Sequence, residues 1–158
     1  MKIVLSRVDE RLVHGQVIAS WTKILSIKKI LIIDTQLAAD DFMKTVISMA
    51  APSGVSVSIL TVDEAVELLR SEEDGSGVNT MLLFKNAVYA LELVEKGVNL
   101  KELNIGNMGA ASARKAISKN VYATPQEIEV FKKLMDKGVY VYLQMVQAES
   151  KVDLHTKL

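Results

Sequence analysis

The chain has 158 residues, 49% of them hydrophobic and 24% charged, which is enough for one domain with a buried core. Its 19 Lys and Arg balance 19 Asp and Glu, so no excess charge draws it to nucleic acid or to an anionic membrane. The absence of cysteine excludes disulfides and thiolate metal sites and fits a reducing compartment. Apolar runs stay far below the roughly 18 residues of a membrane span, and Arg7 interrupts any export signal. We therefore expect a single cytoplasmic domain over residues 1–158.

Short apolar runs alternate with amphipathic stretches from end to end. Strands are predicted at 2–8, 28–34, 55–60, 80–85, 101–106 and 139–143. Helices are predicted at 15–25, 40–50 and 87–97 and after Thr61 and Thr124, while residues 113–123 read as a strand or a loop. The strand at 55–60 alternates apolar and polar residues, so we expect it near a sheet edge. The apolar face of the first helix is predicted to hold Val17, Trp21 and Ile24.

Two helix starts carry capping signatures. Thr61 can accept a hydrogen bond from the backbone three residues further on while Glu64 reaches back, and Thr124 and Glu127 repeat the arrangement. Pro125 fits the first helical position because the N–H that proline lacks would have no partner there. Both helices continue with apolar residues at helical spacing, so they are predicted to pack on a sheet.

Strands that alternate with helices predict an α/β fold with a mostly parallel sheet. In such folds, ligands and chemistry gather beyond the carboxyl ends of the strands. The first strand ends near Val8 and the first helix begins near Gln16, so the loop between them lies at this edge.

The loop "DERLVHG", residues 9–15, contains the residues that best fit phosphoryl chemistry. His14 stands just before a helix, whose free N–H groups and dipole favour an anion, and Gly15 lets the backbone approach that anion closely. Arg11 can fork onto two phosphoryl oxygens. Asp9 or Glu10 can accept the hydrogen of one ring nitrogen of His14 and leave the other nitrogen as the nucleophile.

Several other interpretations of His14 fit the same spacing. It can be a solvated loop residue or a helix cap. The domain can also be a non-catalytic flavodoxin-like module that binds a small phosphorylated ligand reversibly. Alternatively, His14 can serve as the general base of an isomerase or hydrolase that acts on a sugar phosphate and turns over without a partner protein.

Other polar residues are also predicted near the carboxyl ends of the strands. Asn107 and Met108 follow a predicted strand, and Asn107 is either a phosphoryl contact or a turn residue. Lys85 and Asn86 also leave a strand there, but they are interpreted as surface residues. The acidic pairs at 40–41 and 72–73 lack companions at metal-ligand spacing, so no metal is expected. His155 lies in a polar tail and is not expected to be catalytic. The glycines do not form a nucleotide-binding motif.

Beyond these local arguments, "RVDERLVHGQV" at residues 7–17, followed by Trp21, resembles the signature of the enzyme IIB components of the mannose, fructose and sorbose class of the bacterial phosphoenolpyruvate-dependent sugar phosphotransferase system. The segments "ILIID" at 30–34, "NIGNM" at 104–108 and "GVYVYLQMV" at 138–146 are similar to the same family. The resemblance covers essentially the whole chain. It implies an open, mostly parallel twisted sheet with helices on both faces.

The resemblance also implies a role for each residue of the loop. His14 takes a phosphoryl group from a phosphohistidine of enzyme IIA and passes it to a hexose, which enters through the membrane components IIC and IID. Arg11 helps to hold the phosphoryl group, and Asp9, Gly15 and Gln16 complete the motif.

No cofactor is implied, and a cytoplasmic protein that associates peripherally with the membrane permease is expected. Because the chain starts at its first strand, it resembles a free-standing IIB component. The sequence leaves open whether the sugar is mannose, fructose, sorbose or an amino sugar, whether the protein forms homo-oligomers, and which imidazole nitrogen is phosphorylated.

Overall fold

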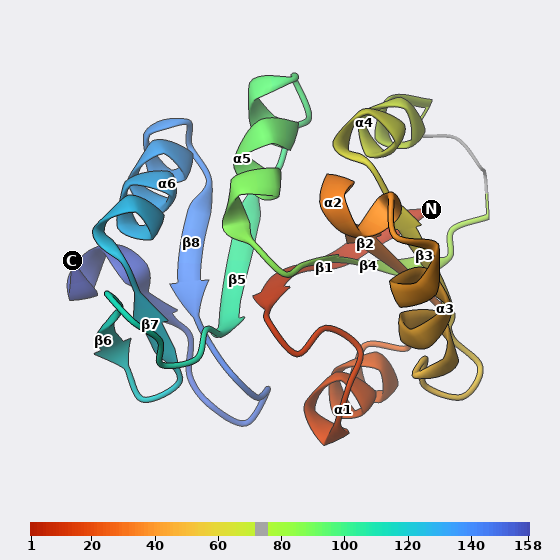
Figure 1. Ribbon diagram of the computed structural model, residues 1–158, viewed down its shortest axis with the longest axis horizontal. Coiled ribbons are helices and arrows are strands. Elements are labelled where there is room, and N and C mark those ends of the chain that lie inside the picture. Colours follow the sequence, from red (N-terminus) through yellow and green to blue (C-terminus); the bar gives the residue numbers. More distant parts are fainter. Residues whose placement is uncertain (72–75) are drawn as a thin grey trace.

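In the computed structural model, which describes residues 1–71 and 76–158, seven strands form one sheet in the order β3-β2-β4-β1-β5-β8-β9 (Figure 1). They are β1 (Lys2–Asp9), β2 (Lys29–Ile33), β3 (Ser56–Leu60), β4 (Asn79–Phe84), β5 (Glu102–Asn107), β8 (Tyr140–Leu143) and β9 (Val152–Asp153). Neighbouring strands are parallel from β3 to β8, and β9 is antiparallel to β8. A separate antiparallel hairpin consists of β6 (Lys115–Ser118) and β7 (Val121–Ala123).

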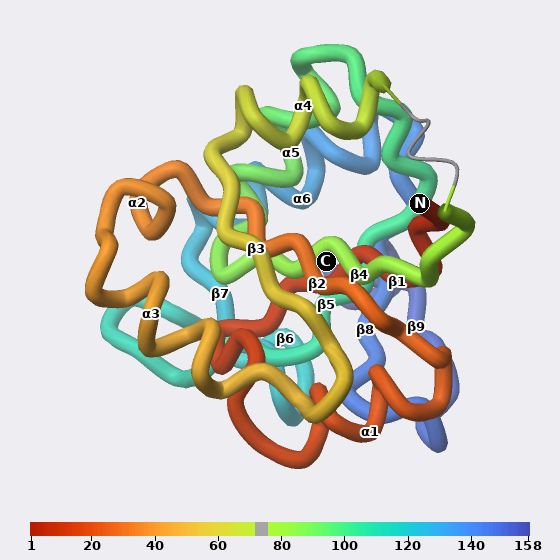
Figure 2. Tube along the Cα trace, turned by 90° about the vertical axis from the view of Figure 1, so that its right-hand side faces the viewer, coloured from red at the N-terminus to blue at the C-terminus, as the bar shows by residue number. Residues whose placement is uncertain are grey.

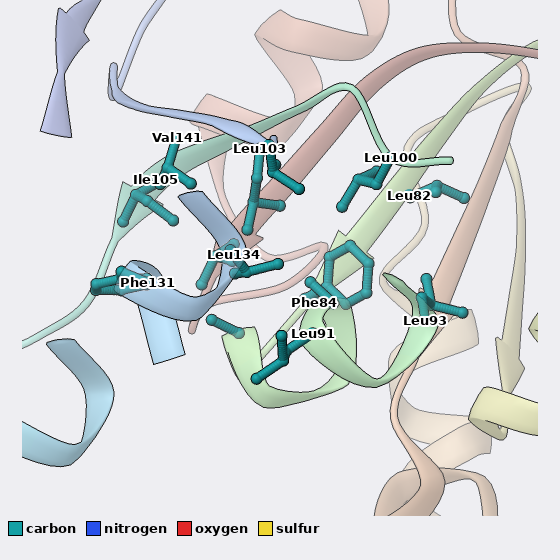
Figure 3. Close-up of a cluster of buried hydrophobic side chains, with 14 of the residues drawn as sticks. Leu82, Phe84, Leu91, Leu93, Leu100, Leu103, Ile105, Phe131, Leu134 and Val141 are labelled. Carbon is teal, nitrogen blue, oxygen red and sulfur yellow. The ribbon is translucent and has the colours of Figure 1, made fainter. Parts of the chain in front are cut away.

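Helices cover both faces of the sheet (Figure 2). They are α1 (Gln16–Ile24), α2 (Thr35–Ala38), α3 (Asp41–Met49), α4 (Val62–Ser71), α5 (Ala87–Glu95) and α6 (Pro125–Asp136), and a short 3-10 helix η1 (Leu154–Lys157) follows β9. The α4, α5 and α6 helices contribute to one hydrophobic core (Figure 3), while α1 and α3 contribute to a second core on the opposite face.

The β2 strand shows why its sequence is apolar throughout. Ile30 and Ile32 belong to the core under α1 and α3, and Leu31 and Ile33 belong to the core under α4, α5 and α6. A strand covered on both faces needs apolar side chains at consecutive positions, as is usual in parallel sheets. The predicted open, mostly parallel sheet with helices on both faces is therefore confirmed.

Local signals in the sequence are confirmed as well. The β3 strand lies at the sheet edge, and residues 113–123 contain the β6–β7 hairpin. Thr61 Oγ1 accepts from Glu64 N at 3.1 Å while Glu64 Oε1 accepts from Thr61 N at 2.9 Å. Thr124 and Glu127 form the corresponding capping box, with Pro125 as the first residue of α6.

The predicted face of the first helix is confirmed for Trp21, which is buried, and for Val17, which is partly buried against the same core, but it is wrong for Ile24. Ile18, Trp21 and Thr22 are the buried residues of α1, whereas Ile24 is 52% exposed. The buried face follows i, i+3 and i+4 from Ile18, and Ile24 points to the other side of the helix. The Trp21 indole fixes this rotation because its Nε1 donates to the carbonyl of Met145 at 3.0 Å.

The C-terminal tail, which reads as polar, folds back on the sheet. β9 pairs with the edge of β8, and Leu154 is fully buried in the core under α6. The acidic pair at 72–73 lies outside the described residues. Within the described ranges, every helix is too short or too polar to cross a membrane.

Candidate active site in the loop after the first strand

The loop between β1 and α1 is anchored by apolar residues and turns its polar residues outward. Leu12 and Val13 are buried in the core that α1 covers, with exposed fractions of 6% and 2%. Backbone hydrogen bonds from Leu12 N to the Asp9 carbonyl at 3.0 Å and from His14 N to the Arg11 carbonyl at 3.2 Å tighten the turn. His14 is therefore an exposed ring on a firmly held loop, at the carboxyl end of β1.

The α1 helix begins directly after His14, as predicted. Gly15 is its N-cap and has a φ of 90°, a conformation that side-chain-bearing residues rarely adopt. No atom lies within 4 Å of the position where a Cβ would stand, so the backbone conformation, and not a lack of space, requires glycine here. Among the described residues, no side chain caps this helix and none in its first turn is acidic. Its N–H groups are available to an anion.

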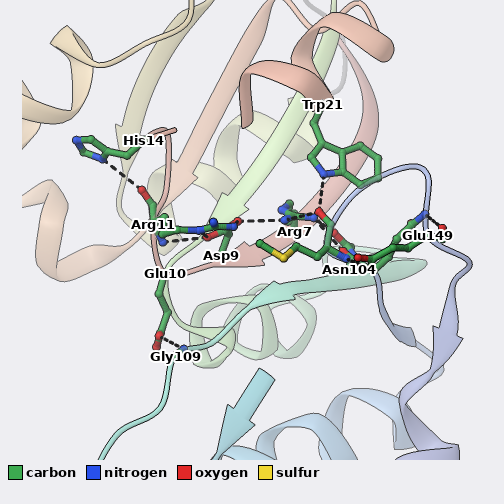
Figure 4. A network of polar contacts seen from close by, with 11 residues as sticks. Arg7, Asp9, Glu10, Arg11, His14, Trp21, Asn104, Gly109 and Glu149 are labelled. Carbon is green, nitrogen blue, oxygen red and sulfur yellow. Dashed lines mark hydrogen bonds and ion pairs between the residues drawn. The ribbon is translucent and has the colours of Figure 1, made fainter. Parts of the chain in front are cut away.

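Asp9 is fully buried and orients Arg11 (Figure 4). Its Oδ1 accepts from Arg11 N at 2.9 Å and from Arg11 Nε at 3.2 Å, and its Oδ2 accepts from Arg11 Nη2 at 3.2 Å. The carboxylate thus occupies the Nε–Nη2 edge of the guanidinium. The Nη1 end of Arg11, whose side chain is 38% exposed, stays directed away from Asp9.

The expectation that Asp9 or Glu10 holds the His14 ring is wrong. His14 Nδ1 lies 3.3 Å from the carbonyl oxygen of Arg11, a long contact that holds the ring weakly. Asp9 is bound to arginines, and Glu10 accepts from Gly109 N at 2.8 Å on another side of the loop. Glu10 is also bound by Arg114, whose Nη2 donates to its Oε2 at 2.6 Å. Charge-assisted hydrogen bonds of this kind are stronger than neutral ones, so both carboxylates are already engaged.

A second, buried arginine lies beneath Asp9. Arg7 donates through Nη1 to Asn104 Oδ1 at 2.6 Å and to the Gln144 carbonyl at 3.1 Å, and through Nη2 to Asp9 Oδ2 at 3.1 Å and to the Met145 carbonyl at 3.0 Å. Burial lowers the pKa of Arg7, and the negative charge of Asp9 opposes this shift. Asp9 therefore pairs with one buried and one partly exposed guanidinium.

Arg7 fits a slot that its neighbours shape. Its Cζ lies 5.4 Å from the centre of the Trp21 ring, within the range of a cation–π contact. The other side of the guanidinium is packed on the backbone of Gly106, where a Cβ would overlap it. Within the described part of the chain, Arg7 Nε is a buried donor without a partner. Sequence reasoning missed Arg7, although an arginine in an apolar strand two residues before an aspartate places both charges on one face.

The other predicted residues of this edge have different surroundings. Asn107 pairs with Asp9 in the register of β1 and β5, and its carbonyl accepts from Glu10 N at 3.2 Å. Its place beside the loop is as expected. Asn86 Oδ1 caps α5 by accepting from Val88 N at 3.0 Å, which is a structural role.

A polar pocket of about 210 Å³ opens next to the loop, on the side of α5 and α6. Its lining includes Glu10, Asp34, Lys85, Asn86 and Arg114. His14 lies outside this lining.

Comparison with known protein families shows which family the chain belongs to. The sequence model of the family described as "PTS system sorbose subfamily IIB component" matches residues 3–158. This chain belongs to that family. The resemblance seen in the loop motif is therefore confirmed over nearly the full length. As a IIB component of the phosphotransferase system (PTS), the protein belongs to a class of sugar-transport phosphotransferases that work with IIA and with membrane IIC and IID components.

Relatives of this IIB component differ in the sugar they are named for. The chain is 36% identical to the PTS system fructose-specific EIIB component of Bacillus subtilis, over 97% of this chain and 93% of the relative. It is 32% identical to the PTS system mannose-specific EIIAB component of Escherichia coli, over 98% of this chain and 47% of that longer protein. The crystal structure of the IIBSor domain of the sorbose permease from Klebsiella pneumoniae superimposes with a TM-score of 0.90 at 32% identity, covering 99% and 96% of the two chains.

Proposed function

We propose that residues 1–158 form one IIB domain in which His14 carries the phosphoryl group. It accepts the group from a phosphohistidine of a IIA component and passes it to a hexose that enters through the membrane IIC and IID components. The observation that carries this proposal is the exposed ring of His14, on a firmly anchored loop and directly before the uncapped start of α1.

Each transfer is a substitution at phosphorus. An unprotonated ring nitrogen of His14 attacks the phosphorus of the donor phosphohistidine, and the P–N bond to the donor breaks as the new P–N bond forms. In the second step a hydroxyl oxygen of the hexose attacks the same phosphorus, the P–N bond to His14 breaks, and the hydroxyl proton is released. Neither step needs a nucleotide or a metal, and the protein contributes mainly position and charge.

Arg11 is proposed to hold the phosphoryl oxygens. Asp9 binds the Nε–Nη2 edge of Arg11, so the Nη1 end remains free to donate to an incoming phosphoryl group. Asp9 is then a positioning residue for Arg11. Arg7 supports this role, because its Nη2 also donates to Asp9 Oδ2 and so fixes the carboxylate that positions Arg11.

Backbone N–H groups and the side chain of Asn107 complete the proposed phosphoryl site. The N–H groups at Gly15 and Gln16 begin α1, where the helix dipole favours the negative charge of a phosphoryl group. Asn107 lies beside Asp9 at the same edge, and we propose its side-chain amide as an additional contact.

An exposed histidine suits transfer between proteins better than the chemistry of a small-molecule enzyme. A general base of an isomerase or hydrolase works in an enclosed pocket that surrounds the substrate, and the pocket beside the loop is lined without His14. The relatives are named for fructose, mannose and sorbose, so we propose that the membrane components select the hexose. In this scheme, the domain associates with the membrane only while it is bound to its permease.

The chain has 2 histidines. In the test, His14 is the proposed phosphorylation site and His155 is the control. Radiolabelled phosphoenolpyruvate, the general carriers of the system and a cognate IIA component are mixed with wild type, His14→Ala or His155→Ala. Wild type and His155→Ala should acquire an acid-labile, alkali-stable label without ATP, and His14→Ala should not. Equal labelling of His14→Ala, or an acid-stable label, would refute the proposal. Reversible binding of a phosphate ester without a label would favour the non-catalytic module.

A further inference from the structure

We propose that Arg114 is a positioning residue for the phosphorylation loop. It lies in the connection between β5 and β6, 104 residues from Glu10, and ties this loop residue to the start of α6. The proposal rests on the function assigned to His14 above and adds to it a residue outside the loop motif.

The guanidinium of Arg114 is saturated by acceptors from separate elements. Nη1 and Nη2 donate to Glu10 Oε1 at 3.0 Å and to Glu10 Oε2 at 2.6 Å. Nε and Nη2 donate to Glu127 Oε1 at 3.0 Å and to Glu127 Oε2 at 2.8 Å. Nη1 also donates to the Gly109 carbonyl at 2.7 Å. A guanidinium has five N–H groups, so these contacts use its full donor capacity.

Burial and charge make this cluster stronger than a surface ion pair. The side chains of Arg114, Glu10 and Glu127 are 13%, 28% and 25% exposed. The hydrogen bonds that Arg114 donates to Glu10, and to a smaller extent those to Glu127, raise the pKa of Arg114, which stays positively charged. Bidentate, partly buried pairs of this kind restrict both partners much more than a mobile surface contact does.

The cluster links the loop to a fixed position at the start of α6. Glu127 is fixed by its capping box with Thr124, and Arg114 extends this fixed point to Glu10. Glu10 also makes two further hydrogen bonds: its backbone N–H donates to the Asn107 carbonyl, and its carboxylate accepts from Gly109 N. Glu10 is directly followed by Arg11, so its position sets the direction in which the loop leaves β1.

Removal of Arg114 would leave two carboxylates facing each other. Glu10 and Glu127 now share the Nη2 atom of one guanidinium, and without it their like charges would repel. Glu10 is the partner expected to move, because it precedes the buried anchors of the loop, Leu12 and Val13, whereas the backbone and side chain of Glu127 are both held by the capping box of α6. The displacement would reach Arg11 and misplace its guanidinium relative to His14.

The experiment measures single-turnover transfer from phosphorylated IIA component to the full chain, at several donor concentrations. Arg114→Met should lower the rate at saturating donor by about tenfold to a hundredfold, the range expected for an ångström-scale misplacement. Lys96→Met is the matched control, because it breaks the exposed Lys96–Asp63 pair of 2.7 Å at the other end of α5. This control should transfer at the wild-type rate.

A double-mutant cycle separates positioning from other roles. Glu10→Gln should be slow like Arg114→Met, and the double variant should be no slower than Arg114→Met, because each change breaks the same link. Effects that multiply, a rate within about twofold of wild type, or a rise in KM alone would overturn the proposal. The last result would assign Arg114 to the docking of the donor.

A conservative variant covers the case in which Arg114→Met does not fold. Arg114→Lys keeps the charge but cannot bind two carboxylates by forks. It should be at least about threefold slower at saturating donor, and wild-type kinetics would overturn the proposal. The two proposals fail in different ways: an unlabelled wild type refutes the role of His14, whereas a labelled wild type with a fully active Arg114→Lys refutes only the role of Arg114.

Discussion

Replacing Gly106 with alanine should strongly destabilise the domain through Arg7. A Cβ at this position would overlap Arg7 Cζ and Nη2 and lie 2.6 Å from Nη1, whereas real Cβ contacts essentially never fall under 3.0 Å. A flexible arginine would ordinarily move aside. Arg7 cannot do so freely, because it is fully buried and donates to Asn104, Gln144, Asp9 and Met145.

The size of the effect follows from these hydrogen bonds. A displaced guanidinium loses at least two bonds of a charged donor, each with a net value of about 1.5–3 kcal/mol. The expected loss is therefore about 3–6 kcal/mol, a range that includes the roughly 3–5 kcal/mol cost of breaking a buried ion pair. This is a large part of the roughly 5–15 kcal/mol by which domains are stable.

Urea unfolding of Gly106→Ala and Gly109→Ala measures the effect against a close control. A Cβ at Gly109 would lie 3.7 Å from Glu10 Oε1, an ordinary contact, so this variant should lose less than about 1 kcal/mol. With a slope of about 2 kcal/mol per molar urea, the Gly106→Ala midpoint should fall by about 2 M. Equal midpoints for the two variants would show that Arg7 is not fixed in this slot.

Two further predictions concern Arg11 and Tyr142. Arg11→Lys keeps the charge but loses the fork, so single-turnover transfer should fall at least about tenfold while the urea midpoint changes little; unchanged transfer kinetics would remove Arg11 from the mechanism. Burial raises the pKa of Tyr142 to about 12. The folded protein therefore keeps this phenol neutral after the unfolded chain ionises it near pH ~10, and stability should be lost as the pH rises from that value. Tyr142→Phe should lose less stability over the same range, and parallel losses in both proteins would contradict this assignment.

The regular part of the fold was predictable because its signals are local. Apolar runs covered on both faces and the two threonine capping boxes fixed the main strands and helices before any tertiary contact was known. The tail was not predictable in this way. β9 has 2 residues at a sheet edge, and Leu154 is its fully buried neighbour, so no periodicity marks the segment. The α2 helix, with 4 residues, is too short to show a pattern either.

The site was predictable in its location and only partly in its contacts. The end of the first strand and the start of the first helix placed His14 and Gly15 correctly. The partners of the acidic residues were not evident, because Arg114 is 104 residues from Glu10 along the chain. Arg7 offered a local signal through its spacing from Asp9. Its other acceptors are the side chain of Asn104, 97 residues away, and two backbone carbonyls, which leave no trace in a sequence.

Arg7 and the carbonyls of Gln144 and Met145 that hold it under the loop are synthesised at different times. The ribosome makes Arg7 and the loop first, but the carbonyls that fix Arg7 are synthesised 137 and 138 residues later, or about 7–28 s at ordinary elongation rates. Until then Arg7 has only part of its final surroundings. A nascent or prematurely terminated chain that ends before β8 therefore contains every residue of the loop motif and lacks the support that orders it. The phosphorylation proposed for His14 should therefore require a chain that has been translated at least through Met145.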